Sequence, residues 1–142
     1  MDDASRLEHR ARLGLRILMK LHESYPEPTA IGPSHAFAPS EKPETAFEGG
    51  TFGGYDDKDV ELAEHLAFRM LEEGIIEGER SGGFIYPATL PARTRRVLGT
   101  RDPNNTCLLS ESVRQALNAH AAGGRISAGE FTRMARLIGF EP

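Results

Sequence analysis

The residue types that could carry out chemistry are few in this chain and widely spaced. The 142 residues include one cysteine, Cys107, and five histidines. Cys107 and His120 would suit nucleophilic catalysis, but they are thirteen residues apart in one helical region, so we expect no contact between them. His9, His22 and His35 recur every thirteen residues, and none has a partner at the i, i+4 spacing of a helical zinc site. The sequence predicts neither an enzyme nor a metal site.

A glycine-rich stretch at residues 48–54 is a further candidate for ligand chemistry. A phosphate-binding loop of this kind ends in Gly-Lys-Ser/Thr, whose lysine contacts the phosphates. This stretch lacks that ending. We therefore expect no cofactor and no small-molecule substrate, and we interpret the glycines as flexible backbone.

Charge is distributed unevenly along the chain. Residues 56–79 contain nine acidic side chains against Lys58 and Arg69, a net charge of −7, whereas residues 80–101 contain five arginines and no acid, a net charge of +5. Nucleic-acid affinity comes largely from neutralising phosphates, so contacts with DNA are expected only from the second segment. The candidate nucleic-acid contacts are Arg80, Arg93, Arg95, Arg96 and Arg101.

The acidic segment suits a basic protein partner instead. The candidate docking residues are Asp59, Glu61, Glu64, Glu72 and Glu73, on a helix expected at 59–73. In an extreme form, this helix is an acidic mimic that inhibits another protein by occupying its nucleic-acid site. A third interpretation gives neither segment a ligand, because the two neutralise each other within one molecule or between two subunits.

Bulk composition is that of a soluble globular protein, with 39% hydrophobic and 27% charged residues. No apolar run approaches the ~20 residues of a membrane span. The first residues are charged where a signal peptide needs an apolar region. The lone cysteine allows no intramolecular disulfide, which suits a reducing compartment. We therefore expect a cytoplasmic protein without membrane contact.

Helical periodicity and capping patterns indicate the elements of the first half. A capping box at Ser5 and Glu8 predicts a helix that ends near Tyr25. Residues 26–57 contain five prolines and are expected to be a long irregular insertion, or to hide a short helix near 43–47. Acidic residues at 56–59 then begin a helix that Gly74 ends.

A β-hairpin and a pair of helices are expected in the second half. Strands at 75–76 and 84–86 flank a turn at 81–83. Residues 91–98 are either a basic helix or a loop. Apolar residues recur at helical spacing from 109 to 120 and from 131 to 138, and Ser127 and Glu130 form a second capping box, which together predict a C-terminal helical hairpin.

The segment around the hairpin resembles a known family. His65-Leu66, Leu71-Glu72-Glu73-Gly74-Ile75-Ile76, Arg80-Ser81-Gly82 and Tyr86 resemble the pattern of bacterial winged-helix regulators and of small winged-helix proteins of bacteria and their phages, over roughly residues 10–90. The resemblance implies a winged-helix-like domain at 1–101 in an α+β, mostly helical fold. The helical hairpin at 102–142 is expected to pack on this domain or at a dimer interface.

The same resemblance implies a transcription-regulator-like protein that binds or associates with DNA. The charges would place that contact in the wing and the segment after it. The alternative function is a non-catalytic protein-interaction module that uses the acidic helix. A homodimer is compatible with both.

Overall fold

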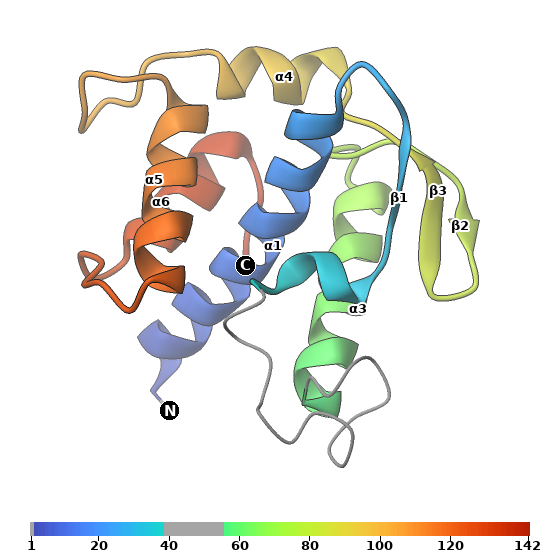
Figure 1. Cartoon of the computed structure of the whole chain (residues 1–142), viewed down its shortest axis with the longest axis horizontal. Helices are drawn as coiled ribbons and strands as arrows, with labels where there is room; N and C mark the ends of the chain where they lie inside the picture. Colours follow the sequence, from blue (N-terminus) through green and yellow to red (C-terminus); the bar gives the residue numbers. More distant parts are fainter. Residues whose placement is uncertain (1, 39–55) are drawn as a thin grey trace.

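The structure, a computed structural model, describes residues 2–38 and 56–142. It has the α+β, mostly helical architecture that the sequence predicts (Figure 1). In chain order the elements are α1 (Asp3–Ser24), β1 (Thr29–Ile31), the 3-10 helix η1 (Pro33–Ala36), α3 (Asp57–Glu72), β2 (Arg80–Ser81), β3 (Phe84–Ala88), α4 (Ala92–Leu98), α5 (Leu109–Ala121) and α6 (Glu130–Ile138).

The long helix α1 runs through the centre of the molecule, and α3, α5, α6 and η1 pack around it (Figure 1). Its middle residues are consequently buried on all sides. Leu13 and Ile17 lie on the arc of the helix that also carries its cations, yet both are fully buried. Burial on every side is typical of a helix at the centre of a core.

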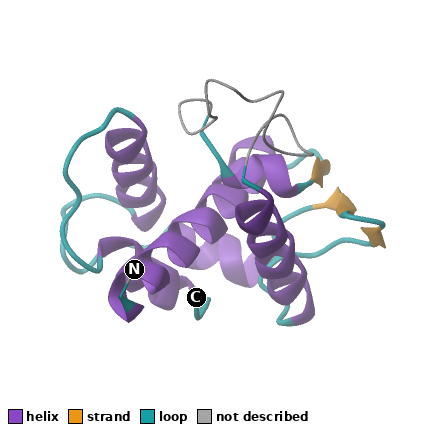
Figure 2. Cartoon of the chain, turned by 90° about the horizontal axis from the view of Figure 1, so that it is seen from below, coloured by secondary structure: helices purple, strands orange, loops and turns teal. Residues whose placement is uncertain are grey.

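The three strands form one antiparallel sheet in the order β1-β3-β2. Thr29 and Ile31 of β1 pair with Ala88 and Ile85 of β3. Seen from below, the strands gather at one end of the molecule and helices occupy the rest (Figure 2). The predicted reversal at Gly82 and Gly83 is confirmed, since Ser81 pairs with Phe84 and Gly82 has a φ of +61°.

The strand predicted at 75–76 is wrong. Gly74 ends α3 with a φ of +76°, as expected, but the N–H groups of Ile75 and Ile76 then both donate to the Met70 carbonyl. These two side chains are buried in the core, and β2 begins only at Arg80. The two adjacent isoleucines therefore indicate burial in the core and not pairing in a strand.

The segment 26–57 is not irregular throughout, because it contains β1 and η1. The short helix expected near 43–47 lies outside the described residues. The sequence allows either a basic helix or a loop at 91–98. The structure has the helix α4 over residues 92–98.

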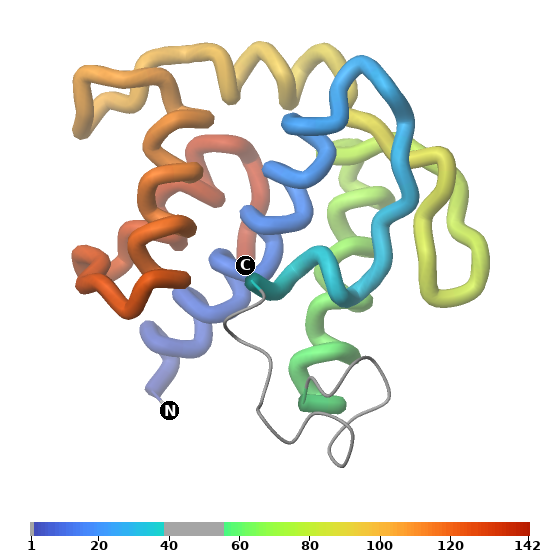
Figure 3. Tube along the Cα trace, in the orientation of Figure 1, coloured from blue at the N-terminus to red at the C-terminus, as the bar shows by residue number. Residues whose placement is uncertain are grey.

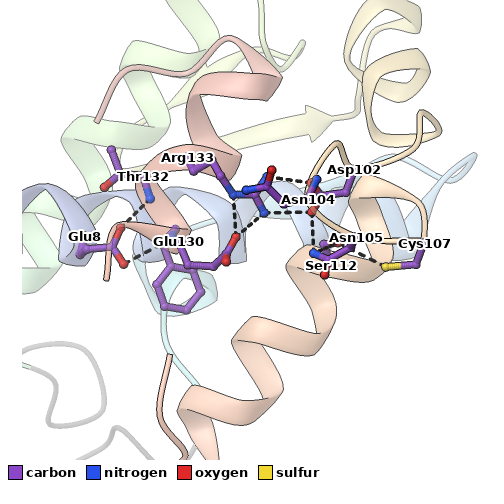
Figure 4. A network of polar contacts seen from close by, with 10 residues as sticks. Glu8, Asp102, Asn104, Asn105, Cys107, Ser112, Glu130, Thr132 and Arg133 are labelled. Atoms are coloured by element: carbon purple, nitrogen blue, oxygen red, sulfur yellow. Dashed lines mark hydrogen bonds and ion pairs between the residues drawn. The ribbon is translucent and has the colours of Figure 1, made fainter. Parts of the chain in front are cut away.

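The capping box predicted at the start of α1 is wrong. The helix begins at Asp3, and the carboxylate of Asp2 accepts a hydrogen bond of 2.7 Å from the Ser5 N–H. Glu8 crosses instead to α6, where its carboxylate accepts bonds from the N–H groups of Phe131 at 3.3 Å and Thr132 at 2.6 Å (Figure 4).

The second predicted capping box, at Ser127 and Glu130, is also wrong. The residue before α6 is Gly129, which has no side chain to cap the helix. The side chain of Glu130 pairs with Arg133 instead of reaching back. Because the first N–H groups of a helix lack partners within it, Glu8 satisfies two of them from the neighbouring helix.

The loop between α4 and α5 is held to α6 by a buried ion pair (Figure 4). The fully buried carboxylate of Asp102 accepts two hydrogen bonds from the Arg133 guanidinium, at 2.7 and 2.9 Å. It also accepts bonds of 3.0 Å from the Asn104 N–H and the Asn105 side-chain amide. The bonds from Arg133 hold the pKa of Asp102 well below its usual range.

The last residues return to α1 and α3 (Figure 3). Phe140 is fully buried, and a Cβ at Gly14 of α1 would lie only 2.4 Å from its ring. Arg10 and Arg69 donate to the carbonyl oxygens of Pro142 and Glu141, at 2.8 and 2.9 Å. The terminal segment thus joins α1 to α3.

One hydrophobic core contains buried residues from α1, α3, the sheet, α5 and α6. The predicted hairpin helices therefore pack on the rest of the chain. The division of the chain at residue 101 and the pairing of the hairpin across a dimer axis stay predictions. No helix among the described residues is both long and apolar enough to cross a membrane.

Candidate functional site

A groove of about 330 Å³ runs along α3 beside the first strand of the hairpin. We call it the α3 groove. Its lining residues are Glu61, Glu64, His65, Phe68, Arg69, Glu72 and Arg80. Six of these seven belong to α3, at spacings of three, four and seven residues that bring side chains to one side of a helix.

Three carboxylates face this groove. Glu61 and Glu72 are exposed and Glu64 is half-buried. Within the part of the chain that the structure describes, none of the three takes part in a hydrogen bond or an ion pair. Unpaired carboxylates on one surface create a negative potential that attracts cations.

Arg69, at the side of the groove, is already paired. Its guanidinium lies 3.6 Å from the Glu73 carboxylate and donates to the carbonyl oxygen of Glu141. Arg69 therefore does not offset the groove carboxylates. Arg80 is the other cation that lines the groove.

Arg80 extends from β2 over the aromatic ring of Phe68, with its guanidinium carbon 3.7 Å from the ring centroid. The hairpin turn lies close to α3 as well, since a Cβ at Gly83 would be 3.5 Å from the Glu64 carboxylate. Phe68 is only 9% exposed, so its ring forms the apolar floor of the groove. The groove thus combines an aromatic surface with unpaired carboxylates.

The predicted docking residues separate into two groups. Glu61, Glu64 and Glu72 line the α3 groove. Asp59 instead contacts His9 of α1, with 3.0 Å between Oδ1 and Nε2, and Glu73 pairs with Arg69. Asp59 and Glu73 therefore have partners inside the molecule.

The predicted nucleic-acid contacts are also divided. Arg80 belongs to the α3 groove, while Arg93, Arg95 and Arg96 lie on α4. Arg95 stacks over Tyr25 at 4.3 Å and donates to the Leu90 carbonyl at 3.3 Å. Arg93 and Arg96 are exposed, as is Arg101 in the loop that follows.

Sequence reasoning missed three residues of the groove, His65, Phe68 and Arg69. All three could have been found by extending the spacing of Glu61 and Glu64 along the same side of α3, since positions 61, 64, 65, 68, 69 and 72 share it. The contribution of the hairpin to the groove could not be predicted from neighbouring residues, because it depends on how the hairpin packs against α3.

Cys107 and His120, the other candidates for catalytic chemistry, make contacts that have a structural role. The Sγ of Cys107 lies 3.3 Å from the Ser112 hydroxyl, and His120 packs edge-on against Phe131. Among the described residues, no group of His, Cys, Asp and Glu side chains is arranged to hold a metal ion.

Comparison with known proteins finds no matching family model, no similar curated protein and no similar solved structure.

Proposed function

We propose that the protein is a winged-helix-like interaction module whose α3 groove binds a cationic segment of a partner protein. The proposal depends on one observation: Glu61, Glu64 and Glu72 face a single groove without ion pairs among the described residues. Lysine or arginine side chains of a partner would supply the counter-charges, and charge complementarity of this kind favours both encounter and specificity.

The order of the elements supports the winged-helix part of the proposal. Among the described residues a helix, a strand, the 3-10 helix η1, the helix α3 and a hairpin come in this order, and the sheet order is β1-β3-β2. In helix-turn-helix proteins the recognition helix lies in the major groove of DNA. We assign α3, which precedes the hairpin, to the corresponding position in this chain.

The charge of α3 favours a protein partner over duplex DNA. DNA carries a dense row of phosphates on both sides of the groove that a recognition helix enters. The three groove carboxylates would approach those phosphates, and they outnumber Arg80, the lining cation that is not in an ion pair with an acid among the described residues. A basic polypeptide segment would instead bring cations to these carboxylates, so the interaction would be attractive.

A second candidate function, nucleic-acid binding through α4, is favoured by the exposed Arg93 and Arg96. These residues are three apart, so they share a face of the helix. With Arg101 they offer three cations in a segment that contains no acid. Neutralising three phosphates gives a slope of about −3 in log affinity against log salt.

The two functions are separated by measuring fluorescence anisotropy of a labelled arginine- and lysine-rich peptide and of a labelled DNA duplex, at ~50 and ~200 mM salt. The proposal predicts peptide binding that the triple variant Glu61→Gln, Glu64→Gln, Glu72→Gln weakens by about tenfold or more, since each exposed ion pair contributes up to ~1 kcal/mol. Duplex binding that Arg93→Ala and Arg96→Ala abolish would support the second candidate.

A matched control is the triple variant Asp3→Asn, Glu27→Gln, Glu77→Gln. It changes net charge by the same amount at exposed positions outside the groove. It is expected to bind the peptide nearly as tightly as the wild type. Equal weakening in both triple variants would show that net charge, and not the α3 groove, governs binding.

A further inference from the structure

A second cleft, of about 240 Å³, lies between α1, η1 and α5. We call it the α1–α5 cleft. Three cations line it, Arg16 and Lys20 from α1 and Arg114 from α5, together with one acid, Glu23. The lining cations thus outnumber the lining acid by two.

This gathering of like charges has a cost in the absence of an anion. Arg16 and Lys20 are four residues apart on α1, a spacing at which like charges repel. Arg114 adds a third cation from the neighbouring helix. A bound anion would convert these repulsions into attractions.

Two of the cations are fixed in place. Arg16 donates a 3.1 Å hydrogen bond to the Leu117 carbonyl, and Arg114 pairs with Glu111 at 2.5 Å. Lys20 is half-buried, and its ammonium group makes no ion pair or hydrogen bond within the described residues. Its ammonium group is therefore available to a ligand.

Neutral hydrogen-bonding groups complete the cleft. Ser34, His35 and Asn118 line it beside the cations. The Gly32 N–H donates to Nδ1 of His35 at 3.0 Å, which leaves the proton of the neutral ring on Nε2. A hydroxyl, an imidazole N–H and an amide can each donate to an oxyanion.

The neighbouring histidines are consistent with a positive potential in this region. Burial, and secondly the charge of Lys20, lower the pKa of His35. Burial, and secondly the charge of Arg114, lower the pKa of His22, while the charges of Glu23 and Glu111 oppose this shift. Each ring is therefore subject to the field of one of the cleft cations.

We infer that the α1–α5 cleft binds a phosphate-sized dianion, either inorganic phosphate or the phosphate group of a small monoester. The cations that line the cleft can meet the charge of such a group near neutral pH, although Glu111 already neutralises part of the charge of Arg114. A cleft of this volume holds a phosphate group but not a large ligand. Guanidinium and ammonium groups are the usual protein partners of phosphate oxygens.

The test is an NMR titration of the full chain with inorganic phosphate at constant ionic strength, observing the imidazole signals of His22 and His35. Saturable shifts of both are expected in the wild type. Lys20→Gln should weaken binding by about tenfold, because it removes a charge-assisted hydrogen bond. Lys58→Gln, which removes an exposed lysine of α3 outside the cleft, should leave the affinity unchanged.

A parallel titration with glycerol phosphate distinguishes the two sources. Tighter binding of the monoester assigns the cleft to a phosphorylated small molecule, and equal binding assigns it to free phosphate. Shifts that do not saturate, or equal weakening by Lys20→Gln and Lys58→Gln, would overturn the inference. Thermal melting of each variant without phosphate verifies that the compared proteins are folded.

Discussion

The guanidinium of Arg80 covers the aromatic ring of Phe68 at 3.7 Å, so a cation of the hairpin is held against the acidic helix α3. Such a contact contributes about 0.5–1 kcal/mol at exposed sites. It links β2 to α3. The stacking therefore contributes to the shape of the α3 groove.

A double-mutant cycle with Phe68→Leu and Arg80→Gln should reveal this coupling. Leucine keeps an apolar side chain in the groove floor but removes the ring, and glutamine removes the cation. We expect a coupling free energy of about 0.5–1 kcal/mol in urea unfolding. The same cycle with Arg69→Gln in place of Arg80→Gln should give a value near zero, because Arg69 pairs with Glu73.

Gly14→Ala should destabilise the protein although alanine is the better helix former. Helix propensity alone would favour alanine by about 1 kcal/mol. At this position the new methyl would lie 2.4 Å from the ring of Phe140, which is fully buried and has no room to move. We expect a net loss of about 1–3 kcal/mol in the free energy of unfolding.

Two further variants test that explanation. Gly99→Ala meets only ordinary contacts at 3.5 Å and should change stability little. Combining Gly14→Ala with Phe140→Leu should recover part of the loss, since the smaller side chain relieves the clash. If Gly14→Ala proves stabilising, the terminal segment does not pack on α1 as described.

Much of the fold could be predicted because its signals are local. The acidic cap and the apolar period of α3, the glycine that ends it and the turn at Gly82 all depend on neighbouring residues. The strand β1 could not be predicted, because its three residues follow two prolines and pair with a strand more than fifty positions away. A strand this short has no period to detect.

Capping was mispredicted for a related reason. The pattern Ser-x-x-Glu at Ser5 marks a plausible helix start, but the same glutamate can serve another helix. Glu8 does so, and only the packing of α1 on α6 decides the choice. The sequence does not encode that packing locally.

The candidate site was half predictable. The acids of α3 were identified from the sequence, and three of the five line the groove. Arg80 was grouped with the arginines of α4 because they share a basic segment. The hairpin fold separates them, and a count of charge along the chain cannot show this.

Glu8→Ala should lower the free energy of unfolding by about 1–2 kcal/mol, because it removes the acceptor for two N–H groups of α6 together with a favourable charge at the helix start. Glu8→Gln keeps an acceptor and should lose less. Ser127→Ala is the matched control, since no side-chain cap from Ser127 is present. A larger loss of unfolding free energy for Ser127→Ala than for Glu8→Ala would support the capping box that the sequence predicts at Ser127 and Glu130.

Asp102→Asn should cost about 3 kcal/mol in urea unfolding, because it leaves Arg133 without its buried counter-charge. Glu130→Gln, which alters the more exposed partner of the same guanidinium, should cost less. Since the pKa of Asp102 is lowered in the folded protein, its contribution is present above the unfolded value of ~3.9 and is lost as the pH falls further. Asp102→Asn should therefore flatten the acid limb of the stability curve.

Histidine titration should make the protein less stable below about pH 6.5. The folded state lowers the pKa of His22 and His35, so the unfolded chain takes up protons first and acidification favours unfolding. Lys20 acts on His35, while Arg114, Glu23 and Glu111 act on His22.

Urea unfolding between pH 5 and pH 8 tests this sign, since the stabilisation is present above ~6.5 and declines as the pH falls through the folded values. The double variant His22→Asn, His35→Asn should show a shallower decline than the wild type. An unchanged slope in the variant, or a wild type that gains stability on acidification, would mean that burial in the folded state does not lower the pKa of these rings.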